Sequence, residues 1–196
     1  MSEKITSTFT FHGNQAVLNL EKEIIRRFKD DYDKGNNRYT SVTRLLYGMS
    51  ESAEFDSYQL LGAYQCWYFG SIDKFEVETA TCPPAKMHDF ITEHAAKIDP
   101  EVVVQMDYRG NTPQLVGTRF ACISNNAELV IGESERELDY NWCDEDDIDD
   151  LIKDGEDPNN LMSFQELDEL IEDLKSDAKA NLDINSAISG TEIFKD

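Results

Sequence analysis

Residues 75–108 have the sequence FEVETATCPPAKMHDFITEHAAKIDPEVVVQMDY, in which two strand-like runs flank one amphipathic stretch. Apolar and polar residues alternate at its start, which predicts a strand that ends at Cys82-Pro83-Pro84. Residues 85–98 repeat apolar side chains at helical spacing, and the paired prolines suit the first turn of a helix. Three consecutive valines within residues 101–108 predict another strand.

The segments on both sides extend this pattern. Asn14 is a suitable cap for a helix whose apolar stripe includes Val17 and Phe28 and which ends near Gly35. A hairpin is expected about Gly70. Further strands are expected in residues 5–11, 66–81, 115–123 and 128–131, and short helical segments in residues 43–49 and 57–64. This order of strands and helices predicts an α+β domain.

A family resemblance covers the stretch from Trp67 to Leu129. It contains FEVETATCPP before a helix, the valine-rich strand, and Gly117 at the start of the next strand. This pattern resembles the ferredoxin-like domain of the YubB type, found in uncharacterised phage and plasmid proteins, where a strand ends in a T-x-W-x-P-P-like motif before the second helix. The resemblance implies a ferredoxin-like antiparallel sheet with helices packed on one face, and an origin in a mobile element. It supplies no catalytic residues.

Acidic residues are concentrated in the last third of the chain. Residues 128–196 contain 23 acids and 5 bases, whereas residues 1–127 contain 17 acids and 13 bases. Most of the net charge of −22 therefore lies in the C-terminal part. A regional negative field of this kind favours either a cationic partner or a solvated surface.

The change in composition predicts three parts. Residues 1–132 are expected to form the ferredoxin-like domain, residues 133–180 an acidic helical extension packed on it, and residues 181–196 a loosely ordered tail. The extension is expected to contain helices in residues 144–153 and 163–175. The second of these begins with the S-x-x-E pattern of a capping box and has a strongly amphipathic sequence.

The acidic segment does not match a calcium-binding loop. Placing Gly155 at the sixth loop position puts Ile152 third and Leu161 twelfth, where an EF-hand needs oxygen ligands. The four cysteines form no C-x-x-C pair, which argues against zinc. His88 and His94 lack the spacing of a chelating pair, and both are expected to be surface or boundary residues.

Signatures of phosphate-binding loops and hydrolase elbows are also missing from the sequence. We therefore predict no catalytic residues, no metal, no cofactor and a non-enzymatic function. The basic cluster on the first helix alternates with acids, which favours local ion pairs over direct binding of nucleic acid. No stretch is long and apolar enough to span a membrane, and the N-terminus lacks a signal peptide pattern, so a cytoplasmic location is expected, in the host cell if a phage encodes the protein.

The acidic block favours a protein that binds and inhibits a basic nucleic-acid-binding protein, such as a nuclease, helicase or defence effector, by presenting ordered carboxylates in place of phosphates. The candidate partner-binding residues are Glu133, Glu135, Glu137, Asp139, Asp144, Glu145, Asp146, Asp147, Asp149, Asp150, Asp154, Glu156, Asp157, Glu166, Asp168, Glu169, Glu172 and Asp173.

Other functions are compatible with the same residues. The acids could be only a solvated cover over a ferredoxin-like ligand-binding module or a modest enzyme. The terminal helix could instead pair with its copy in a second molecule. The sequence leaves these alternatives open.

Overall fold

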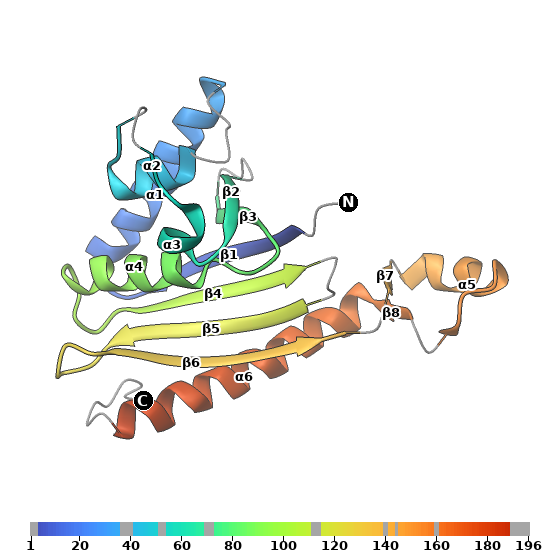
Figure 1. The fold of residues 1–196 in the computed structure, drawn as a ribbon. Helices are drawn as coiled ribbons and strands as arrows, with labels where there is room; N and C mark the ends of the chain where they lie inside the picture. Colours follow the sequence, from blue (N-terminus) through green and yellow to red (C-terminus); the bar gives the residue numbers. More distant parts are fainter. Residues whose placement is uncertain are drawn as a thin grey trace.

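The computed structural model describes residues 4–35, 41–50, 54–68, 73–110, 115–138, 141–143, 145–158 and 161–188. A six-stranded sheet forms its centre, with strand order β2-β3-β1-β4-β5-β6 and antiparallel pairing throughout (Figure 1). The strands are β1 (Lys4–His12), β2 (Tyr64–Tyr68), β3 (Phe75–Ala80), β4 (Val103–Gly110), β5 (Leu115–Ile123) and β6 (Leu129–Glu137). The predicted α+β class with an antiparallel sheet is confirmed.

Among the described residues, four helices precede the acidic region, and they agree closely with the predicted segments. They are α1 (Gln15–Asp33), α2 (Ser41–Tyr47), α3 (Ser57–Leu61) and α4 (Ala85–Ala96). Asn14 caps α1 as expected, because its side-chain oxygen accepts from the backbone N–H groups of Ala16 and Val17. β2 and β3 pair as the predicted hairpin requires, although Gly70 itself lies outside the described residues.

The main core lies between these helices and one face of the sheet. Residues 5, 7, 9 and 11 of β1 are buried in strict alternation, as their pattern predicts. Phe9 stacks on Phe75 of β3 at a centroid distance of 4.7 Å. Met87 and Ile91 of α4 and Phe28 of α1 belong to the same buried cluster.

The C-terminal helix α6 (Phe164–Ile188) covers the other face of the sheet. Cys122 of β5 pairs with Val130 of β6, and paired residues of neighbouring strands point to the same face. Phe120, two positions before Cys122, shares that face, which is the one opposite the main core. These side chains form a second buried cluster with Ala178 and Leu182 of α6. In Figure 1, α6 lies along β5 and β6, with the first four helices on the opposite side of the sheet.

α6 is longer than the sequence pattern indicates. The helix was expected to end near residue 175, but it continues to Ile188, and Leu182 and Ser186 are buried. Residues 181–188 are therefore the end of a packed helix and not part of a loose tail. The apolar pattern weakens there because Leu182 is the only large apolar residue in the buried series Ala178, Leu182 and Ser186.

β6 is also longer than expected. It was predicted in residues 128–131, but it pairs with β5 from Leu129 to Glu137. The predicted boundary between residues 132 and 133 therefore falls inside a strand of the central sheet. The glutamates after Gly132 lack an apolar face, and backbone pairing to β5 keeps them in the strand.

Between β6 and α6 the chain forms a small separate unit. β7 (Asn141–Cys143) and β8 (Leu161–Ser163) pair in parallel, and α5 (Glu145–Lys153) lies between them in the chain. The predicted acidic helix in residues 144–153 is thus confirmed over the described residues. Figure 1 shows this unit beyond the end of β6, away from the main core.

We predict that replacing Gly132 disrupts the docking of α6. A Cβ atom at this position would lie 2.1 Å from the backbone oxygen of Ala178 and 2.3 Å from the backbone nitrogen of Leu182. Gly132→Val should lower the free energy of unfolding by about 2–4 kcal/mol, measured by urea titration. The control Ala180→Val adds the larger side chain on the exposed side of α6 and should cost less than about 1 kcal/mol. Equal losses in the two variants would contradict this account of the packing.

Candidate functional site

The outer side of α6 carries the most regular group of candidate carboxylates. Leu167, Leu174, Ala178 and Leu182 are buried against the sheet or the β7–β8 unit, so the opposite side of the helix is exposed. Five exposed acids lie close together on that side, namely Asp168, Glu169, Glu172, Asp173 and Asp177, and Asp183 is exposed nearer the end of the helix. The first four were predicted from the sequence, and Asp177 was missed because the helix was expected to end at residue 175.

The spacing of these five acids follows from helix geometry. They lie within ten consecutive positions, which span about 12–14 Å of helix at roughly 1.5 Å per residue. One strand of duplex DNA places about four phosphates in the same axial length. A shallow groove runs along this side, lined by Gln165, Asp168, Glu169, Ile171, Glu172, Asp173 and Lys175.

Lys175 pairs with one acid of this surface and with the sheet. It is half-buried and turned toward the sheet, where its Nζ lies 3.4 Å from Asp107 Oδ2 of β4. Its other contact is with Glu172 Oε1 at 2.8 Å. The contacts of Lys175 therefore tie α6 to the sheet and involve one of the five acids, Glu172.

Glu166 serves the start of the helix. The backbone N–H of Ser163 donates to Glu166 Oε2 at 2.9 Å, and the backbone N–H of Glu166 donates to Ser163 Oγ at 3.1 Å. This reciprocal pair is the predicted capping box, and it is confirmed. Glu166 thus fixes the first turn of the helix that carries the other acids.

The acids of α5 and the following loop form a second group. Asp147, Asp149, Asp154 and Glu156 are exposed. The remaining candidates of this region that the structure describes are Glu145 and Asp146 in α5, Asp150, which pairs with Lys153 at 2.6 Å, and the exposed Asp157. Asp139 and Asp144 lie outside the described residues.

Two of the three edge-strand candidates contact buried residues. The Tyr108 hydroxyl lies 3.1 Å from Glu133 Oε1 and 2.8 Å from Glu135 Oε2. Glu133 Oε2 also lies 3.8 Å from Arg119 Nε. Burial, followed by the negative charge of Glu133, raises the pKa of the Tyr108 hydroxyl well above its usual range, so it stays protonated and can donate. Glu137 is exposed at the end of the strand.

The outer edge of β6 is covered by α6. The side-chain amide of Asn181 donates to the backbone oxygen of Glu133 at 3.0 Å, and that of Asn185 donates to the backbone oxygen of Ile131 at 2.6 Å. These bonds occupy carbonyl groups that would otherwise be open to another strand. Charged side chains and covered carbonyls together protect this edge, which gives Glu133 and Glu135 a structural role.

A buried polar network lies beside these glutamates, and sequence reasoning missed it. His88 is fully buried, so the expectation of a surface or boundary histidine is wrong. Its Nδ1 accepts from Arg119 Nη1 at 2.6 Å, because a guanidinium can only donate, and its Nε2–H donates to the Val104 carbonyl at 2.9 Å. Burial, together with the charge of Arg119, lowers the pKa of His88 to about 3. The imidazole is therefore neutral at pH 7.

Arg119 connects this network to α4. Its Nη1 donates to the Ala85 carbonyl at 3.4 Å, and its Nη2 lies 2.7 Å from Asp89 Oδ1, close enough for an ion pair although not aligned for a hydrogen bond. The guanidinium is thus surrounded by protein groups on several sides. This arrangement stabilises the packing of α4 on the sheet.

The part of the chain that the structure describes contains no group of three His, Cys, Asp or Glu side chains placed to hold a metal ion. Burial raises the pKa of the thiols of Cys66 and Cys122, the latter to about 11, so neither is a thiolate at neutral pH. The thiol of Cys82 donates to the Gly62 carbonyl at 3.1 Å.

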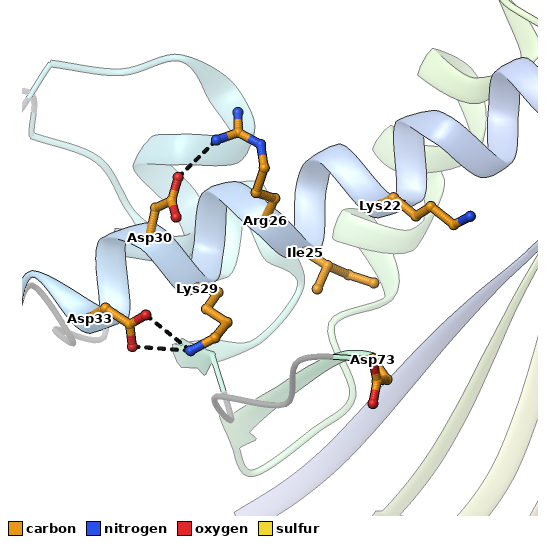
Figure 2. A pocket seen from close by; sticks show the side chains of 7 residues that line it. All are labelled: Lys22, Ile25, Arg26, Lys29, Asp30, Asp33 and Asp73. Atoms are coloured by element: carbon orange, nitrogen blue, oxygen red, sulfur yellow. Dashed lines mark hydrogen bonds and ion pairs between the residues drawn. The ribbon is translucent and has the colours of Figure 1, made fainter.

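The basic cluster of α1 lines a hollow that Figure 2 shows from close by. Arg26 Nη1 lies 2.8 Å from Asp30 Oδ2, and Lys29 Nζ lies 3.0 Å from Asp33 Oδ2. The predicted local ion pairs are therefore confirmed. Because acids of the same helix pair with Arg26 and Lys29, and Asp73 also lines the hollow, its three cations face three acids, which disfavours binding to phosphates.

Comparison with known proteins finds no matching family model, no matching curated protein and no matching solved structure. None of the described helices is long and apolar enough to cross a membrane.

We predict that Arg119→Leu destabilises the fold. The change would leave Asp89 and Glu133 without their cation and His88 without its donor. The free energy of unfolding should fall by about 3 kcal/mol in a urea titration. Arg109→Leu, which removes the same charge from an exposed position on β4, should change it by less than about 0.5 kcal/mol. A similar small effect at both positions would contradict the role of the buried network.

A second prediction concerns pH. His88 binds a proton near pH 6.5 in the unfolded chain but only near pH 3 in the folded protein, so its neutral form contributes full stability above pH 6.5 and less as the pH falls. The stability difference between the wild type and His88→Gln should therefore shrink on acidification, by up to about 1.4 kcal/mol per pH unit between these values. His94→Gln, at an exposed position, is the control. A difference that does not change with pH would refute this assignment.

Proposed function

We propose that this protein is a non-enzymatic interaction protein of a phage or mobile element, built on a ferredoxin-like domain with an acidic extension. It binds and inhibits a basic nucleic-acid-binding protein of the host or of a defence system. The carboxylates of α6 take the place of a phosphate backbone. One observation carries this proposal: five acids are exposed on one side of a helix whose other side is buried against the rest of the protein.

The docking of α6 supports the proposal energetically. A partner that binds to a flexible acidic tail must also order that tail, which costs free energy for each side chain and backbone unit that is fixed. Here the apolar contacts of Ala178 and Leu182 and the amide bonds of Asn181 and Asn185 already hold the helix. The carboxylates therefore keep their spacing before a partner arrives.

The acids of α5 have a different role in this proposal. They lie at the far end of the molecule from the main core, where they extend the negative field along the direction of α6 (Figure 1). Charges of this kind increase the rate of encounter with a basic surface more than they increase affinity. The order of importance for binding is therefore α6 first and α5 second.

The proposal can be tested with purified duplex-DNA-binding proteins. The protein should bind a susceptible partner and compete with duplex DNA for it, and the affinity should fall when salt rises from about 50 to about 200 mM. An affinity that ignores salt, or simultaneous binding of DNA and this protein at separate sites, would refute phosphate imitation.

Matched variants distinguish the two acidic groups. One variant neutralises the outer side of α6, with Asp168→Asn, Glu169→Gln, Glu172→Gln, Asp173→Asn and Asp177→Asn. The other removes the same charge from the α5 region, with Asp147→Asn, Asp149→Asn, Asp150→Asn, Asp154→Asn and Glu156→Gln. The α6 variant should bind at least about tenfold more weakly than the wild type, and the α5 variant within about threefold. Equal losses would show that net charge, and not the ordered helix, determines binding.

A further inference from the structure

An apolar groove lies on the opposite side of the sheet, between α1, α2 and α4. Its walls are formed by Leu20 and Ile24 of α1, Leu45 and Leu46 of α2, and Phe90 of α4, and its floor by the buried Phe28 and Ile91. Its volume is about 130 Å³. An apolar cavity of about 150 Å³ in another protein accepts a benzene molecule, so this groove has space for one small ring or a short branched chain.

The wall residues are only partly covered by protein. Leu20, Ile24, Leu45, Leu46 and Phe90 are all intermediate in exposure, although the four aliphatic side chains pack against the main core. Five neighbouring apolar side chains in contact with water form an unusual surface on so highly charged a protein. A ligand that covered them would gain about 25 cal/mol for each Å² of apolar surface removed from water.

Two polar side chains at the rim restrict the kind of ligand. Arg27 has its Nε bonded to Glu23 Oε1 at 2.8 Å, and that same oxygen also lies 2.8 Å from Arg26 Nη2. Arg27 therefore shares its carboxylate partner, and its terminal N–H groups are available at the rim. A carboxylate of a ligand can accept two hydrogen bonds from such a guanidinium.

His94 is the second rim residue. Its ring packs against Phe90 at a centroid distance of 4.0 Å with the two planes tilted by 35°, and its Nδ1–H donates to the Phe90 carbonyl at 2.9 Å. Tyr47 packs on the same phenyl ring, also at 4.0 Å. These contacts hold the aromatic wall in place and leave Nε2 of His94 as a polar group at the opening.

We propose that this groove binds a small aromatic or branched-chain carboxylic acid, with its apolar end on Phe28 and Ile91 and its carboxylate at Arg27 and His94. The apolar walls favour the hydrocarbon part, and the shared guanidinium favours the acid group. The site is separate from the outer side of α6, because the two lie on opposite faces of the sheet. Either proposal can therefore fail without affecting the other.

Phenylacetate is a suitable probe, and phenylacetamide is its neutral counterpart of nearly the same shape. Backbone amide shifts in a two-dimensional NMR titration should change in α1, α2 and α4 and not in α5 or α6. A ligand of about ten non-hydrogen atoms is expected to bind with a Kd in the millimolar range. Phenylacetamide should bind more weakly than phenylacetate.

Three variants make the test specific. Arg27→Gln should weaken binding of phenylacetate about fivefold, as loss of a partly exposed charge pair implies, and should leave phenylacetamide unchanged. Lys22→Gln removes the same charge from the same helix outside the groove and should have no effect on either probe. Ile24→Phe adds a ring to the wall and should abolish binding of both, with thermal unfolding used to confirm that the variant is folded.

Three results would overturn the proposal. The first is the absence of shifts in these helices at about 20 mM phenylacetate, well above the expected Kd. The second is equal binding of the acid and the amide together with no effect of Arg27→Gln, which would show that the groove is only an apolar surface. Shifts confined to other elements would also exclude this site.

Discussion

The close approach of α6 to Gly132 is the contact on which the C-terminal half of the structure depends. Because this residue lacks a side chain, the backbone of the helix can lie directly on β6, near Ala178 and Leu182. At this distance the side chains of Asn181 and Asn185 reach the edge carbonyls of the same strand. The orientation of the helix is thereby fixed about its own axis, and the side opposite the contact faces water.

The sequence predicts the elements whose side chains alternate or repeat along one face. β1, β4 and β5, together with α1 and α4, have such faces, and the structure contains all five. β6 was cut short because the residues after Gly132 are glutamates, and pairing with β5 extends it. The end of α6 was missed because Ala178 is too small to mark a buried face by hydrophobicity alone. Both errors occur where backbone approach, and not side-chain size, determines the packing.

The candidate site was predictable only in part for a related reason. Glu133 and Asp168 are alike in the sequence, as two members of one acidic region. The alternation of β6 turns Glu133 toward Tyr108 and Arg119, whereas the helical repeat turns Asp168 toward water. The network around Arg119 joins residues about thirty positions apart, and no local pattern indicates such a pairing. Composition located the charge, and only the fold showed which acids bond to buried side chains and which point only toward water.

A comparison of the two long helices explains why α6 supports the proposed function better than α1. On α1, charges four residues apart are opposite in sign, as in Arg26 with Asp30 and Lys29 with Asp33, and each pair stabilises the helix by a few tenths of a kcal/mol. On α6, Glu169 and Asp173 have the same sign and spacing, and such pairs destabilise a helix by a similar amount. A surface that served only for solubility could use the α1 pattern at no such cost. On α6 the buried side of the helix offsets the repulsion, which is the arrangement expected where the negative field itself is used for binding.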